Sequence, residues 1–153
     1  MKKIFLVLTA MFCVATVSAQ KTKWAAGLRA TYGVQAVAEY FYSADKYVEG
    51  RLGIFGGACA DFTAIHQWNC CNWDWTPSVG KWYLDAGVGA NLGGAAHSFW
   101  AGVAGDVKFG IKFNKVPIRL SVDYTPVIGY NFAAGHFHTP GFYNVALSAT
   151  WHF

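Results

Sequence analysis

Hydrophobic and polar residues alternate strictly along the last stretch of the chain, from Phe142 to Phe153, and this alternation constrains the fold more than any other feature. Successive side chains of a β-strand point to opposite faces, so an alternating segment has one apolar and one polar face. Several earlier segments repeat the pattern, and most of the eight acidic residues fall on the polar faces. The chain is therefore expected to be all-β. The apolar face of the last segment takes Tyr143, Val145, Leu147, Ala149, Trp151 and Phe153.

The composition favours a barrel whose apolar face points outward. Hydrophobic residues make up 54% of the chain and charged residues 13%, and there are 7 Trp, 8 Tyr and 12 Phe. After residue 19 we find no sustained helical periodicity and no apolar run near the ~20 residues of a transmembrane helix. A soluble sandwich with a half-buried sheet is the alternative, but it would have to bury an unusual number of Trp and Phe side chains. A closed transmembrane barrel instead turns its apolar face to lipid and its polar face to the lumen.

The N-terminus has the pattern of a secretory signal. Lys2 and Lys3 precede an apolar run, and Val17-Ser18-Ala19 supplies the small residues of a cleavage site. We therefore expect a signal peptide at residues 1–19 and one domain, an outer-membrane β-barrel, at residues 20–153. Removal of the two lysines lowers the net charge from +4 to +2 (4 − 2 = 2). That balance is too mild, and the charges are too interleaved, to predict nucleic acid as a partner.

The alternating segments predict an eight-stranded antiparallel up-and-down transmembrane β-barrel. Because eight is an even number, both ends of the barrel domain are expected on one side, the periplasm. Longer connections are expected at 69–80 and 133–141, and short reversals elsewhere. The predicted strands span 24–32, 34–42, 47–56, 58–68, 81–92, 99–113, 118–132 and 142–153.

Aromatic residues fall at outward positions near the periplasmic ends of these strands. Amphipathic rings prefer the membrane–water interface, so this set predicts an aromatic girdle. Its members are Trp24, Tyr40, Tyr42, Trp68, Trp82, Phe113, Trp151 and Phe153.

The inward-facing charges are expected to fill the lumen. An eight-stranded barrel has an interior just wide enough to be filled by its own side chains. Charges buried there should pair and hydrogen-bond. We therefore expect a closed polar plug, with a narrow pore as the alternative. The predicted lumen charge network is Arg29, Glu39, Glu49, Arg51, Asp61, Asp85, Asp106, Lys108, Arg119 and Asp123.

Two turns predict which charges lie opposite each other across neighbouring strands. They are centred near Asp45 and Lys115. The expected pairs are Glu39 with Arg51, Lys108 with Asp123 and, at the rim, Lys112 with Arg119.

Histidine and serine residues in the predicted outer loops raise the alternative of a lipid-modifying enzyme, such as a lipid A deacylase or acyltransferase. His97-Ser98 and His136-Phe137-His138-Thr139 lie in these loops. A Ser–His pair needs a third group to orient the base, and none of the eight acidic residues falls in an outer loop. We therefore expect no enzymatic activity. A structural zinc site takes four ligands, so these histidines do not predict a metal, and no cofactor is expected.

Three cysteines follow residue 19. Cys70 and Cys71 lie in the predicted 69–80 connection, where an oxidising compartment permits a disulfide, although adjacent cysteines close a strained ring. Either redox state is open for this pair. Cys59 lies near the opposite rim and is expected to be a small buried hydrophobe.

Five segments support a family resemblance: Gly27-Leu28-Arg29, and the stretches 48–52, 82–89, 116–126 and 146–153. Through them the chain resembles the small eight-stranded outer-membrane β-barrel proteins of Gram-negative bacteria, a group that includes the OmpA- and OmpX-like barrels. The resemblance implies contact with outer-membrane lipid and a structural or interaction role rather than catalysis. It also implies that the barrel-assembly machinery recognises the last segment, through Leu147, Trp151 and Phe153. We expect a monomer.

Overall fold

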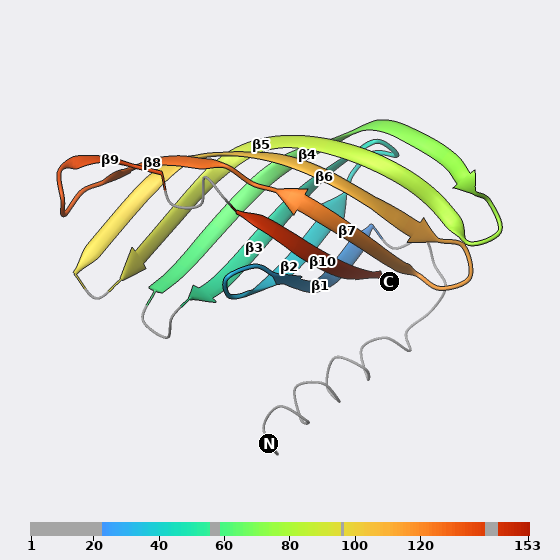
Figure 1. Cartoon of the computed structure of the whole chain (residues 1–153), viewed down its shortest axis with the longest axis horizontal. Coiled ribbons are helices and arrows are strands. Elements are labelled where there is room, and N and C mark those ends of the chain that lie inside the picture. Colours follow the sequence, from blue (N-terminus) through green and yellow to red (C-terminus); the bar gives the residue numbers. More distant parts are fainter. Residues whose placement is uncertain (1–22, 56–58, 96, 140–143) are drawn as a thin grey trace, which may run out of the picture.

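The computed structural model describes residues 23–55, 59–95, 97–139 and 144–153, and the regular secondary structure of these residues is β (Figure 1). The signal peptide predicted at residues 1–19 lies outside the described residues. No helix in the described segments is long and apolar enough to cross a membrane.

The strands are β1 (Trp24–Ala30), β2 (Val34–Phe41), β3 (Lys46–Phe55), β4 (Cys59–Thr76), β5 (Gly80–Ala95), β6 (Ser98–Phe113), β7 (Ile118–Tyr124), β8 (Val127–Asn131), β9 (His136–His138) and β10 (Val145–His152). They form one antiparallel sheet, which closes because β5 pairs with β6 and β1 pairs with β10. β7 and β8 pair with successive parts of β6, so together they count as one strand of the barrel. β9 adds a short strand to β8. The result is a closed eight-stranded up-and-down barrel, so the predicted all-β antiparallel barrel of eight strands is confirmed.

The seventh predicted strand, 118–132, is broken in two. Pro126 has no N–H group to donate to a neighbouring strand, so the ladder is interrupted beside it. The flanking groups are still hydrogen-bonded. Thr125 donates its N–H to the Asn144 carbonyl (2.9 Å), and Gly105 donates its N–H to the Pro126 carbonyl (2.9 Å). Alternation continues through the break, which is why the sequence pattern does not reveal it.

The predicted long connection at 69–80 is wrong. This segment extends the β4–β5 hairpin to a tight turn between Thr76 and Gly80. The pairing contains register shifts between Asn69 and Cys71 and between Trp73 and Thr76. Such bulges place consecutive residues against one partner residue and interrupt the period of two. The extended strand therefore lacks the alternation that predicts strands elsewhere.

The predicted connection at 133–141 is also partly structured, because it contains β9. The last strand starts at Val145 rather than at Phe142, and residues 140–143 lie outside the described part of the chain. In β10, Val145 and Leu147 are exposed whereas Ala146 and Ser148 are buried. The two predicted faces of the final segment are thus present.

Inward glycines allow the strands to approach closely. At Gly27, a Cβ atom would lie 1.9 Å from the Ala149 carbonyl oxygen, and at Gly89 it would lie 1.9 Å from the Ala64 carbonyl oxygen. A side chain at either position would collide with backbone of the neighbouring strand. These residues therefore have a steric reason to be glycine.

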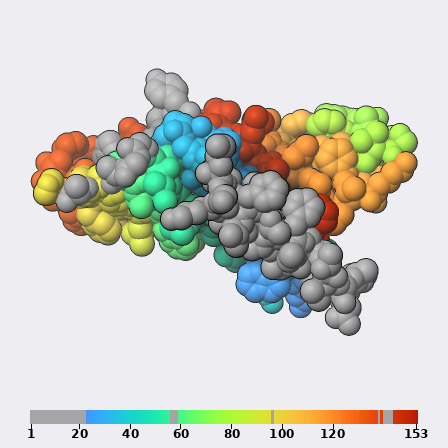
Figure 2. Space-filling model, turned by 90° about the horizontal axis from the view of Figure 1, so that it is seen from below, coloured from blue at the N-terminus to red at the C-terminus, as the bar shows by residue number. Residues whose placement is uncertain are grey.

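The barrel has two mouths. At the terminal mouth β1 begins and β10 ends, with Ala25 opposite His152, and the β2–β3, β4–β5 and β6–β7 turns surround the opening. The β1–β2 turn, the β5–β6 turn and the β8–β9 hairpin surround the other opening, the distal mouth. The β4–β5 tip (lime) and the β8–β9 hairpin (orange-red) lie at opposite ends of the elongated molecule (Figure 2).

Candidate functional site

The predicted lumen charges lie inside the barrel. Asp61 is half-buried near the distal mouth, and the other nine are at most 6% exposed. Asp61 comes from β4, and the other nine come from β1, β2, β3, β5, β6 and β7, at positions whose side chains share the inward face. The barrel thus has charged groups in its interior and exposed large hydrophobic side chains on its exterior.

The backbone register places Glu39 of β2 opposite Glu49 of β3, and Arg51 opposite Val37. The predicted Glu39–Arg51 pair is therefore wrong. The β2–β3 turn is centred one residue earlier than expected, and this moves every cross-strand partner by two residues. Arg51 instead binds Glu49 of its own strand, because residues two apart share a face.

The predicted register between β6 and β7 is confirmed. Lys108 lies opposite Asp123, and Lys112 lies opposite Arg119. The Lys108 ammonium group nevertheless binds the Glu49 carboxylate and lies 3.5 Å from Glu39 Oε1. Two neighbouring carboxylates thus share one lysine from the opposite wall.

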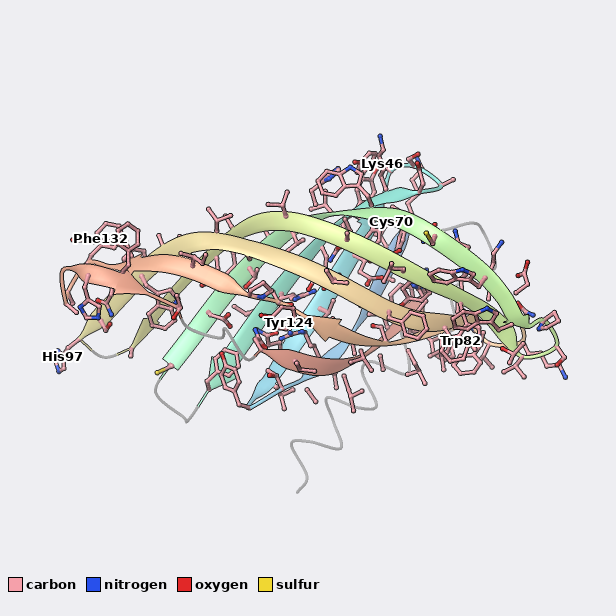
Figure 3. All side chains as sticks on the ribbon, turned by 45° about the horizontal axis from the view of Figure 1, so that its top comes forward. Lys46, Cys70, Trp82, His97, Tyr124 and Phe132 are labelled. Carbon is pink, nitrogen blue, oxygen red and sulfur yellow. The ribbon has the colours of Figure 1, made fainter. Side chains whose placement is uncertain are left out.

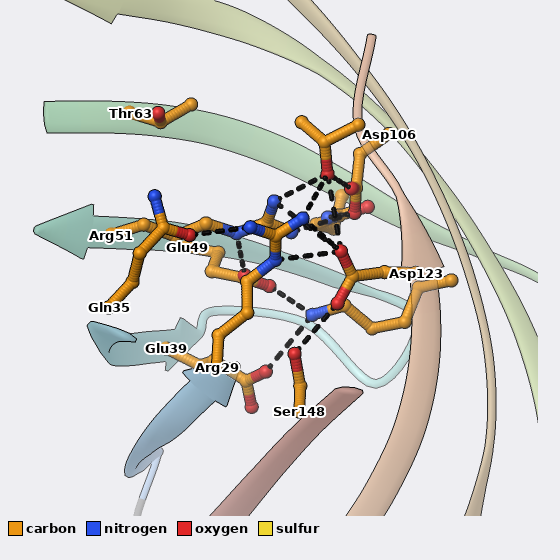
Figure 4. Close-up of polar contacts among 12 residues, drawn as sticks. Arg29, Gln35, Glu39, Glu49, Arg51, Thr63, Asp106, Asp123 and Ser148 are labelled. Carbon is orange, nitrogen blue, oxygen red and sulfur yellow. Dashed lines mark hydrogen bonds and ion pairs between the residues drawn. The ribbon is translucent and has the colours of Figure 1, made fainter. Parts of the chain in front are cut away.

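Two arginines organise the distal half of the network (Figure 4). Arg29 donates to Asp123 (2.7 Å) and to Gln35 (2.6 Å), and Arg51 donates to Asp106 (3.0 Å). The Thr125 hydroxyl accepts from both guanidinium groups, at 3.2 Å from Arg29 and 2.7 Å from Arg51. These contacts tie strands from opposite sides of the barrel together.

Arg119 organises the terminal half. It donates to Asp85 (2.6 Å) and lies 3.7 Å from Glu39. Its guanidinium carbon is 4.0 Å from the centre of the Tyr83 ring and 5.2 Å from that of Tyr47, so cation–π contacts add to the ion pairs. The Tyr47 hydroxyl donates to Asp85 at 2.7 Å.

Several residues outside the predicted charge network complete it. Gln67 donates to Asp106, Ser148 donates to Asp123 (2.7 Å), and Asn144 accepts from Arg29 (3.1 Å). Buried charges need such partners, since an unpaired polar group in a low dielectric is costly. The signal that identifies them is the alternation: Gln67 lies six residues from Asp61 on β4, and Asn144 and Ser148 lie on the polar face of the alternating final segment.

The packed charges separate two cavities. One, of about 640 Å³, opens at the terminal mouth, and the other, of about 170 Å³, lies toward the distal mouth. Among the described residues the two cavities share no lining side chain. Five charged residues of the network line neither cavity and lie between them. We call this layer the septum; it consists of Glu39, Glu49, Asp106, Lys108 and Asp123.

The histidine and serine residues of the distal loops have other contacts. The Ser98 hydroxyl accepts a hydrogen bond from Asn131 (2.7 Å), and His136 Nδ1 lies 3.2 Å from the Ala134 carbonyl oxygen. Within the described residues, no group of three or more His, Cys, Asp or Glu side chains is placed to hold a metal ion. Cys70 and Cys71 are exposed free thiols on β4, and half-buried Cys59 lines the distal cavity.

Neither a scan against protein-family models nor searches of curated proteins and of solved structures found a match to this chain.

Proposed function

We propose that this chain is a small integral outer-membrane β-barrel protein with a closed, charge-filled lumen and a structural or interaction role without catalysis. The observation behind the proposal is the exterior of the barrel, where large aliphatic side chains are exposed around a polar interior. In water this arrangement would be unfavourable, whereas lipid solvates the aliphatic band and the lumen contains the charges. The band includes Leu28, Leu52, Ile54, Val103, Leu120, Val122, Ile128 and Leu147, at 42–67% exposure.

Exposed aromatic residues at both ends of the barrel support the same proposal. Trp24, Tyr42 and Trp68 surround the terminal mouth, and Phe99 and Phe132 lie toward the distal mouth. Figure 3 shows Trp82 and Phe132 at opposite ends of the molecule. Aromatic rings at two levels are the pattern of residues that lie at the two interfaces of a bilayer. The terminal mouth would then face the periplasm.

The septum favours a closed lumen over a pore. Within it Lys108 binds Glu49, and on its distal side Asp106 binds Arg51; the side chains involved are at most 1% exposed. An ion crossing the barrel would have to displace these pairs, and each uncompensated buried charge costs several kcal/mol. The role that remains is one performed by the barrel surface and its mouths.

One experiment tests both where the chain is located and whether it forms a closed barrel. Outer-membrane fractions should contain a chain that migrates faster on gels before boiling than after, because a closed barrel resists detergent until it is heated. Reconstitution of the purified chain into planar bilayers should give no ion conductance. A soluble chain with a single gel mobility would overturn the membrane proposal, and steady conductance would overturn the closed lumen.

A further inference from the structure

A row of three cations crosses the inner wall of the terminal mouth. Lys81 of β5 lies opposite Lys112 of β6, and Lys112 lies opposite Arg119 of β7. Neighbouring strands are ~4.8 Å apart, so the three backbone positions span about 10 Å. Like charges directly opposite each other destabilise a sheet. All three side chains line the cavity of about 640 Å³, so their positive charges border the same open space.

The carboxylates of the mouth leave this row with excess positive charge. Arg119 is paired with Asp85, but neither Lys81 nor Lys112 forms an ion pair with any described residue. Asp45 accepts a 2.8 Å hydrogen bond from Ser43, which holds the pKa of its carboxyl below the usual range. The lining contains four cations and two carboxylates, a net charge of +2 (4 − 2 = 2): Lys23, Lys81, Lys112 and Arg119 against Asp45 and Asp85.

A buried ring nitrogen without a partner lies on the same wall. His152 Nε2 is inaccessible and has no hydrogen-bond partner among the described residues. The His152 ring packs 5.1 Å from Phe41, centre to centre, and both residues line the cavity. An unsatisfied polar atom of this kind is expected to have a partner such as a water or a ligand. In the tautomer that has its proton on Nε2, an anion bound beside Lys112 would supply an acceptor for it.

We propose that the terminal mouth binds a compact multivalent oxyanion, a phosphate or pyrophosphate group, through the Lys81 and Lys112 ammonium groups and the His152 ring. Arg119 supplies charge from behind the site, where Asp85 and Tyr83 hold it in place. A bound phosphate turns the repulsion along the row into charge-assisted hydrogen bonds, which are among the stronger polar contacts in proteins. This inference depends on the barrel fold and goes beyond the membrane role proposed above.

The test is a titration of the folded chain with inorganic pyrophosphate in maltoside micelles, at constant ionic strength, followed by ³¹P NMR and by the heat-modification midpoint. Saturable binding and a raised midpoint are expected. Lys112→Gln and Lys81→Gln should each weaken binding by roughly tenfold, the change that follows loss of one charge-assisted hydrogen bond. Lys115→Gln is the matched control, because Lys115 lies in the β6–β7 turn of the same mouth and outside the cavity lining.

The stability of the variants separates binding from folding. Without pyrophosphate, Lys112→Gln should unfold at or above the wild-type temperature, because the change relieves like-charge repulsion. With pyrophosphate, its midpoint should rise less than that of wild type or of the Lys115→Gln control. Absence of saturable binding to wild type, or equal shifts in Lys112→Gln and the control, would overturn the proposal.

A competition experiment distinguishes a soluble phosphate from the phosphate of a lipid headgroup. Short-chain phosphatidic acid is added to the micelles during the pyrophosphate titration. Competition by the lipid would support the site and indicate that a headgroup can reach it. Undiminished pyrophosphate binding would also support the site and restrict its ligand to soluble phosphates.

Discussion

Lys108 lies directly opposite Asp123 on the paired strands β6 and β7, yet its ammonium group binds Glu49 and approaches Glu39 on the other side of the lumen. Asp123 is instead bound by Arg29 of β1. In a lumen this narrow, long side chains reach residues several strands away. The ion-pair partners are therefore selected by packing across the barrel, and the backbone register limits them only in part.

Glu49 and Glu39 should differ in their contribution to stability. Glu49→Gln removes the charge that binds both Lys108 and Arg51, and should lower the free energy of unfolding by about 3–5 kcal/mol. Glu39→Gln should cost less, because the ion pairs of Glu39 are 3.5 and 3.7 Å long and the change relieves repulsion from Glu49. Urea-unfolding curves in micelles measure both changes. Equal losses would show that the two carboxylates are equivalent.

The inward face of the barrel could be predicted from the sequence because a period of two reports side-chain direction without reference to the rest of the fold. Arg29, Glu49 and Asp123 are buried where the alternation places them. The prediction fails where a bulge changes the period, as in β4 beyond Asn69. At Pro126 the alternation continues, with Thr125 and Val127 both buried, but it does not reveal the break in the ladder.

The partners inside the lumen were less predictable. When the centre of the β2–β3 turn moves by one residue, the residue opposite Glu39 becomes Glu49 instead of Arg51. The local sequence does not determine where that centre lies. Contacts such as Arg51 of β3 with Asp106 of β6 join strands that are not neighbours, so no turn relates them. Only part of the row at the terminal mouth could be predicted. The expected β6–β7 register placed Lys112 beside Arg119, whereas the place of Lys81 opposite Lys112 depends on the β5–β6 register, which the sequence pattern did not predict.

Gly89 and Gly50 provide a steric comparison within one barrel. A Cβ atom at Gly89 would lie 1.9 Å from the Ala64 carbonyl oxygen, whereas at Gly50 the nearest atom, on Phe62, is 3.9 Å away. Gly89→Ala should therefore lower stability by about 1–3 kcal/mol, as overpacking does in other cores. Gly50→Ala should have little effect. Heat-modification midpoints measure both variants, and a Gly89→Ala barrel as stable as Gly50→Ala would contradict the predicted clash.

Phe153 should be needed for assembly in cells. Its N–H donates to the Trp24 carbonyl at 3.1 Å, where the first and last strands meet, and the family resemblance implies recognition of this residue by the assembly machinery. Deletion of Phe153 should lower the heat-modifiable fraction in the outer membrane, while refolding into detergent survives. Phe153→Tyr, which keeps the ring, is the control and should assemble normally. Wild-type membrane levels of the deletion variant would refute a role in assembly.

Val122 and Asp123 are neighbours in β7 whose side chains should meet different surroundings. Val122 is 48% exposed on the outer face and Asp123 is 1% exposed in the lumen. In a membrane, Val122→Arg would place a charge in hydrocarbon at a cost of about 2–4 kcal/mol near the midplane. Asp123→Asn would leave Arg29 less well paired, so both variants lose stability and stability alone does not separate the two faces.

Accessibility does separate them. Single cysteines are introduced at positions 120 to 124 of a chain whose native Cys59, Cys70 and Cys71 are replaced by serine, and the protein is reconstituted into lipid vesicles. Fluorophores at positions 120, 122 and 124 should be shielded from water-soluble quenchers and quenched by lipid-attached probes. Cysteines at 121 and 123 face the lumen and should show no quenching by lipid probes. If both sets behave alike, the alternation of β7 does not distinguish lipid from lumen, and a barrel in water becomes the better description of this chain.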